Sequence, residues 1–218
     1  MIPGLAEYVD IDDRVDLLTS LYNKVKDQGG NTFGKTAFTG YSLEDNRTGE
    51  PNGYQEIYEP ILSEHRKVHP YYQGRSTGFN AADSTEKDVF AHSDVDYHLE
   101  HPNYFNIVIP ILGASRIDHF ETDPDEIYLP ELDAHGHSYY HEFKVQKEMG
   151  QGSPEFEKYL SDRKIGHIIV DKPLLLDTNT MHRVVVTEAP RCAWVTRWNN
   201  IPKEIDYHTF KDMIESIL

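Results

Sequence analysis

The strongest constraint on the fold is a series of short runs rich in β-branched and aromatic residues between residues 87 and 200. Turn-forming residues separate the runs, which is typical of β-strands. No helical pattern alternates with them, so repeated βαβ units are excluded, and a sandwich or barrel is favoured. The eight runs are DVFAHSDV, YFNIVIPIL, SRIDHFET, HSYYHEFKV, IGHIIV, PLLLDT, HRVVVTE and RCAWVTRW.

Helices are expected outside this β-rich region. Residues 10–28 form an apolar stripe that Asp10 or Asp12 can cap, and QGGN ends it. Residues 53–68 and 206–218 are also amphipathic, with Asp206 as the cap of the last helix. We therefore expect one domain over 1–218: helical support over 1–86, a β core over 87–200 and a closing helix over 201–218. The core contains an insertion, 122–165, which is interpreted equally well as a lid or as a surface elaboration.

Composition limits the partners and the compartment. Lys and Arg number 21 and Asp and Glu 37, a formal charge of −16, which disfavours nucleic acids and anionic membranes. The N-terminus lacks the pattern of a secretory signal, no apolar run is long enough to span a membrane, and the single Cys192 cannot form an internal disulfide. These features predict a soluble cytoplasmic protein, and they leave its oligomeric state open.

The candidate chemistry centres on His92 and Asp94 in the stretch VFAHSDVDYH. Two residues apart on an extended strand, their side chains point to one face and can share a divalent ion. Such a pair alone is more typical of a solvated edge strand. His182 starts a later β-rich run and offers a third ligand, and Arg191, nine residues further on, offers a group that binds carboxylates in bidentate fashion.

This ordered set, His92-x-Asp94, His182 and Arg191, resembles the iron(II)/2-oxoglutarate-dependent dioxygenase superfamily, and the spacing from His182 to Arg191 resembles its prolyl-hydroxylase-like members. The resemblance implies a double-stranded β-helix, a jellyroll or cupin-like barrel, over residues 87–200. It also implies His92, Asp94 and His182 as ligands of Fe(II), and Arg191 as the partner of the distal carboxylate of 2-oxoglutarate. O2 would be the oxidant, and succinate and CO2 the coproducts.

The resemblance also leaves points open. The family often has a serine two residues after the arginine, where this chain has Ala193. Asn106, expected to point inward from YFNIVIPIL, is a further candidate contact of the cosubstrate, and Arg197 is the alternative anchor to Arg191. Hydroxylation of a small molecule, an amino acid or a peptide or protein side chain is the expected reaction, with the acidic surface favouring a neutral or cationic substrate.

Three other interpretations stay open. His135, His137 and Glu142 partly match a cupin metal motif, which would keep the barrel and move the metal. A metal-dependent hydrolase could use Asp96 and His98 beside His92 and Asp94, but four such positions span about 20 Å on a straight strand, too far for one ion. A barrel without catalysis would serve as a binding module, although such a module has no need of Arg191.

Overall fold

The centre of the protein is a pair of long, bent strands that run antiparallel. The computed structural model describes residues 1–32, 38–44, 50–69, 77–85, 91–94, 103–128 and 141–218. The two strands are β5 (Asn103–Phe120) and β10 (His182–Ile201), with His182 opposite His119 and Ile201 opposite Asn103. Shorter strands extend the sheet on both sides: β9 (Leu174–Asp177) and β8 (Lys164–Val170) pair with β5, β4 (Gly78–Ala82) pairs with β10, β1 (Ala6–Tyr8) pairs with β9, β3 (Thr39–Ser42) pairs with β4, and β2 (Asn31–Thr32) pairs with β3.

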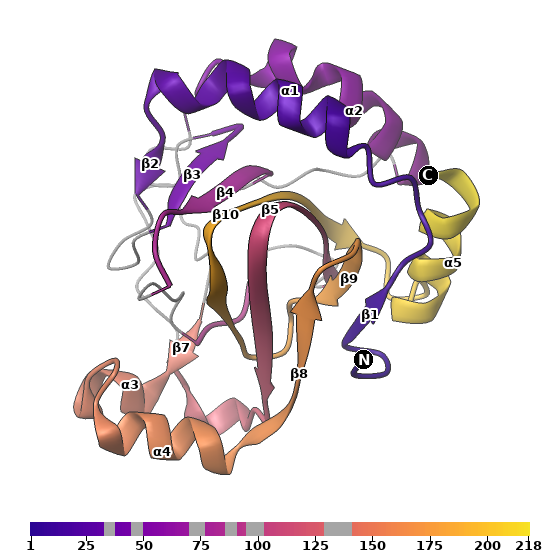
Figure 1. Cartoon of the computed structure of the whole chain (residues 1–218). Helices are drawn as coiled ribbons and strands as arrows, with labels where there is room; N and C mark the ends of the chain where they lie inside the picture. The colour runs from indigo at the N-terminus through magenta and orange to yellow at the C-terminus, as the bar shows by residue number, and fades with distance from the viewer. Residues whose placement is uncertain (33–37, 45–49, 70–76, 86–90, 95–102, 129–140) are drawn as a thin grey trace.

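Both central strands bend at the same level, near Gly113 and Pro190, where the register between them shifts. Gly113 has a φ of +62°, and a Cβ there would lie 2.3 Å from the carbonyl oxygen of Pro190, so only glycine fits. The bend sends the two halves of each strand into two facing sheets (Figure 1). One buried cluster accordingly contains residues of both sheets: Val108, Ala193 and Val195 from one, and Ile117, Ile168 and Val170 from the other. The fold is a double-stranded β-helix, as predicted.

Three helices cover the outer face of one sheet: α1 (Val15–Val25), α2 (Gln55–Val68) and α5 (Tyr207–Ile217), with a short 3-10 turn, η1 (Lys26–Gln28), after α1. Side chains of β10 alternate between two environments, because successive residues of a strand point to opposite faces. Cys192, Trp194 and Trp198 pack against the helices, whereas Ala193 and Val195 pack between the sheets. After the bend, the inner wall of the barrel therefore carries the odd-numbered residues of this strand.

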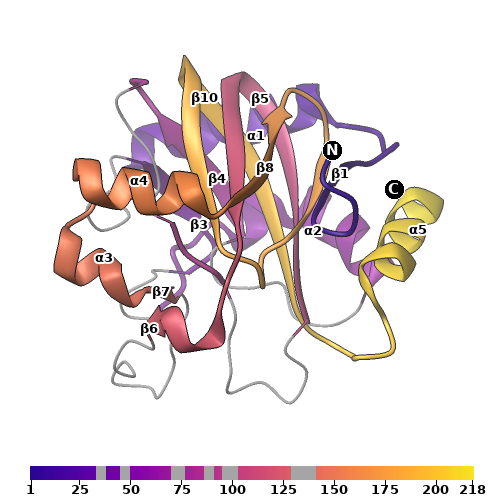
Figure 2. The ribbon, with the colours of Figure 1, turned by 90° about the horizontal axis from the view of Figure 1, so that it is seen from below.

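The inserted segment adds a second group of elements on the side away from α1 and α2 (Figure 2). Its described residues form η2 (Pro124–Glu126), β6 (Ile127–Tyr128), β7 (Glu142–Phe143), α3 (Lys144–Met149) and α4 (Pro154–Asp162). Ser153 caps α4, since its hydroxyl accepts a hydrogen bond from the backbone N–H of Phe156 at 3.1 Å. The sequence reasoning missed this helix, although a serine cap followed by Pro154 is a helix-start signal.

Several boundaries differ from the predictions. The first helix starts at Val15 rather than near residue 10, because Arg14 adopts a left-handed conformation, with a φ of 52°. The proposed caps at Asp10 and Asp12 were therefore wrong, whereas the Asp206 cap is confirmed by its 2.8 Å hydrogen bond with the N–H of Thr209.

The number of strands also differs. YFNIVIPIL and SRIDHFET form one strand, β5, and HRVVVTE and RCAWVTRW form another, β10. The run HSYYHEFKV is not one strand: among its described residues, Glu142 and Phe143 form β7, and the last two residues of the run begin α3. The strands β1 and β4 were not predicted from the sequence. Within the described ranges, no helix is long and apolar enough to cross a membrane.

Candidate metal centre

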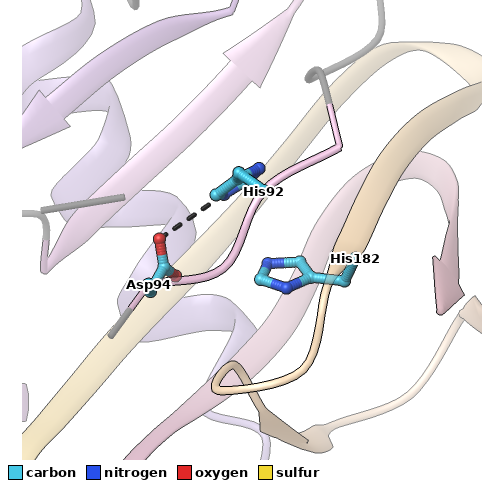
Figure 3. A group of neighbouring side chains, drawn as sticks. All are labelled: His92, Asp94 and His182. Carbon is cyan, nitrogen blue, oxygen red and sulfur yellow. Dashed lines mark ion pairs between the residues drawn. The ribbon is translucent and has the colours of Figure 1, made fainter. Parts of the chain in front are cut away.

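The barrel brings His92, Asp94 and His182 together at one end of its inner wall (Figure 3). His182 is the first residue of β10, and its backbone exchanges two hydrogen bonds with His92, of 2.9 and 2.8 Å. One ligand atom from each of the three side chains lies within 4.8 Å of the other two, and all three residues are buried. Two imidazoles and one carboxylate so arranged can hold one divalent metal ion and leave coordination positions open.

The tautomer of His182 suits metal binding. Its Nδ1 lies 2.9 Å from the carbonyl oxygen of Thr180, which can only accept a hydrogen bond, so Nδ1 carries the proton and Nε2 keeps a free lone pair. Burial lowers the pKa of His182 to about 3, so the ring is neutral at physiological pH. A neutral imidazole is the form that coordinates a metal.

The two oxygens of Asp94 have different neighbours. Oδ1 lies 3.4 Å from Nε2 of His92. Oδ2 accepts hydrogen bonds from Nη1 of Arg197 at 2.5 Å and from Nδ2 of Asn106 at 3.3 Å. Burial opposes ionisation of this carboxyl, but the charge of Arg197 and the hydrogen bond to His92 outweigh it and hold the pKa of Asp94 far below its usual range. Asp94 is therefore a carboxylate at any physiological pH.

Arg191 lies on the same face of β10 as Arg197, six residues nearer to the bend. It is 4% exposed, its Nη1 donates a 3.0 Å hydrogen bond to the carbonyl oxygen of Asn80, and its guanidinium lies 5.4 Å from the ring centre of Phe38. Burial lowers its pKa to about 10, which leaves it charged at neutral pH. Within the described ranges no acidic side chain forms an ion pair with Arg191. A buried charge without a counterion is costly, so the interior favours an anion here.

The structure thus separates the two candidate arginines by their neighbours. Arg197 forms an ion pair with Asp94 directly at the triad, whereas Arg191 lies nearer to the bend, without a carboxylate partner among the described residues. Asn106 points inward as expected, but its observed contact is Asp94. No signal in the sequence separates these roles, because all three residues simply alternate inward on their strands.

His119 was not singled out from the sequence, yet it lies on the inner wall beside the triad. It pairs with His182 across the two central strands, and the ring centres are 6.1 Å apart. The residue is fully buried, and neither ring nitrogen has a hydrogen-bond partner within the described ranges. Burial lowers its pKa to about 4. The inward alternation of Ser115, Ile117 and His119 on β5 is the signal that would have identified it.

The described residues of the insertion pack behind the histidines. Ser93, between His92 and Asp94, exchanges two backbone hydrogen bonds with His141, of 3.0 and 2.9 Å. One buried cluster joins the residues that precede the two histidines to the insertion: Ala91, Phe120 and Met181 with Phe143, Phe156 and Leu160. The rest of the insertion, residues 129–140, lies outside the described ranges, and so does the prediction that it forms a lid. Four candidate ligands also lie outside these ranges: Asp96, His98, His135 and His137.

No protein-family model matches the sequence, and a search of curated proteins found no match. The structure is similar to HygX from Streptomyces hygroscopicus, solved with nickel, 2-oxoglutarate and hygromycin B bound, with a TM-score of 0.48 and 10% identity over 93% of this chain and 84% of that one. It is also similar to ycfD from E. coli, with a TM-score of 0.41 and 10% identity over 79% of this chain, although it spans only 36% of ycfD. The L-ribose isomerase of Cellulomonas parahominis has a TM-score of 0.37, 10% identity, and coverage of 88% of this chain and 85% of that one. These likenesses concern overall shape and assign no residue of the site.

Proposed function

We propose that the protein is an Fe(II)- and 2-oxoglutarate-dependent oxygenase. One observation carries this proposal: the same inner wall holds a cluster of two histidines and one carboxylate and, separately, a buried guanidinium with no acidic partner among the described residues. A metal-binding barrel without a cosubstrate needs only the two histidines and the carboxylate. The buried guanidinium matches a dicarboxylic acid that extends from the metal toward the bend.

In this proposal each side chain has a defined role. His92, Asp94 and His182 hold Fe(II) on one face and leave three positions open, two for the 2-oxo acid group and one for O2. Arg191 pairs with the distal carboxylate, and burial strengthens that pairing because the guanidinium is already removed from water. With iron and cosubstrate bound, the site supplies oxidative decarboxylation of the 2-oxo acid coupled to oxidation of the substrate.

Hydroxylation is the proposed outcome, with succinate and CO2 as coproducts. The net charge of −16 supports a neutral or cationic small molecule or side chain as the substrate, because an acidic surface repels anions. Burial of the three ligands supports a reaction sequestered from bulk water, which protects reactive species from side reactions.

The decisive experiment is an anaerobic titration of the Fe(II)-loaded protein with 2-oxoglutarate, followed by the visible charge-transfer band of the metal chelate. We expect the band in the wild type and its loss in His182→Ala. Arg191→Met should raise the 2-oxoglutarate concentration at half-saturation by at least about 30-fold, since breaking a buried charge pair costs about 2 kcal/mol or more.

Arg183→Met is the matched control. Arg183 lies on the same strand but on the outer face, where it pairs with Glu157 at 2.9 Å and with Asp118 at 3.7 Å. We expect it to leave the cosubstrate titration unchanged. A folded protein that binds Fe(II) and shows no band at saturating 2-oxoglutarate would contradict the proposal and leave a cupin-type metal enzyme or a binding module.

A further inference from the structure

The contacts of Asp94 assign a role to the second arginine that differs from anchoring the cosubstrate. Oδ1 of this carboxylate lies 3.4 Å from Nε2 of His92, while Arg197 and Asn106 occupy Oδ2. The side chain of Arg197 is 14% exposed, and its backbone N–H donates a 3.1 Å hydrogen bond to the hydroxyl of Thr77. This bond fixes the backbone of β10 at the residue that carries the guanidinium.

The geometry points to Arg197 and Asn106 as positioning residues that keep Asp94 a one-oxygen ligand of the metal. This inference rests on the proposed function. A free aspartate can offer both oxygens to a metal, and a second Asp94 oxygen would take one of the positions that the 2-oxo acid needs. A charge-assisted hydrogen bond at 2.5 Å competes directly with such coordination. Outer contacts of this kind commonly orient metal ligands.

The alternative is that Arg197 binds the distal carboxylate of 2-oxoglutarate. A monocarboxylic 2-oxo acid such as 2-oxobutanoate separates the two roles, because it chelates a metal through the same two oxygens but has no distal carboxylate. In Arg197→Met, positioning predicts that the half-saturating concentrations of 2-oxoglutarate and 2-oxobutanoate rise by the same factor, about 10-fold or more. In Arg191→Met, only the 2-oxoglutarate value should rise.

The anaerobic charge-transfer titration is therefore run with both acids on the wild type, Arg197→Met, Arg197→Lys and Arg191→Met. Arg197→Lys, which keeps a cation near Oδ2, should recover some of the loss for both acids. Loss confined to 2-oxoglutarate in Arg197→Met would overturn the inference, and so would unchanged binding of both acids. Asn106→Ala, which removes only the 3.3 Å contact, replaces Arg197→Met if that variant does not fold, and should shift both acids equally by a smaller factor.

A manganese(II) readout distinguishes failure of this inference from failure of the proposed function, because it requires no cosubstrate. In the Mn(II)-loaded protein the positions that the three ligands leave open hold water, and bound Mn(II) speeds the relaxation of the protons of each exchangeable water molecule. Without any 2-oxo acid, Arg197→Met should show a lower water-proton relaxation rate than the wild type, because the second oxygen of Asp94 displaces a water molecule, whereas Arg183→Met should not. Identical relaxation rates in the wild type and Arg197→Met would overturn the positioning role, whatever the wild type does with 2-oxoglutarate.

Discussion

Replacement of Gly113 by alanine tests the bend that turns two long strands into two sheets. A Cβ at this position would lie 2.3 Å from the carbonyl oxygen of Pro190 and 2.4 Å from that of Glu188, with the Cα of Arg191 at 3.1 Å. These are backbone atoms, so the clash cannot be relieved by rotating a side chain. The positive φ of +62° adds a second cost, because alanine disfavours the left-handed region.

The magnitude follows from these two terms. The left-handed conformation costs about 1–2 kcal/mol for a residue with a Cβ, and forcing a group into a filled site costs about 1–3 kcal/mol. We therefore expect Gly113→Ala to lower the free energy of unfolding by about 2–5 kcal/mol. With a urea dependence of about 2–3 kcal/mol per molar, the unfolding midpoint falls by about 0.7–2.5 M.

Gly53→Ala is the matched control, because Gly53 also has a positive φ, +78°, but nothing lies within 4 Å of its added Cβ. Urea unfolding, followed by tryptophan fluorescence, should show a loss of only about 1–2 kcal/mol for this variant. Equal destabilisation by the two substitutions would refute the claim that close packing of the strands at the bend requires glycine. The metal-free protein suffices for this measurement.

Two further predictions concern buried titratable groups. His65 is 2% exposed and shares a 2.7 Å hydrogen bond with Thr196. Burial lowers its pKa to about 3. Below pH 6.5 the unfolded chain therefore takes up a proton on this histidine that the folded chain does not. The free energy of unfolding should fall as the pH drops from 6.5 toward 3, by up to about 1.4 kcal/mol per pH unit for this histidine. Urea titrations at several pH values should show a weaker dependence of this free energy on pH in His65→Gln. An unchanged dependence would contradict the assignment. Burial raises the pKa of Cys192 to about 12, and the residue is 1% exposed. A thiol reagent should therefore label Cys192 only after unfolding. Fast labelling of the folded protein would contradict its burial.

The packing of the inserted segment behind the candidate metal site could not be predicted from the sequence. It contributes Phe143, Phe156 and Leu160 to the cluster that also holds Ala91 and Met181, the residues just before the two histidines. These contacts join residues more than 20 positions apart, and no local pattern specifies them. The helix α4 itself could have been predicted, because a serine cap followed by a proline, here Ser153 and Pro154, is a local signal for the start of a helix.

The sequence alone determined the features that depend on local spacing. Short β-rich runs without alternating helices indicated the barrel, and His92, Asp94 and His182 were identified as one cluster from their residue types and order. Alternation along a strand also predicted that Asn106 points inward. Each of these inferences uses neighbours in the chain, or a pattern that the chain repeats.

Only the tertiary structure decided how the inner wall divides its polar groups. Arg191 and Arg197 have the same parity on one strand, so alternation treats them alike. The pairing of Arg197 with Asn106 and the bridge between His92 and His182 bring Arg197 to Asp94. Arg191 lies nearer to the bend, without a carboxylate partner in the described ranges. The physical reason is that a charge takes its role from what surrounds it, and these surroundings come from strands far apart in the sequence.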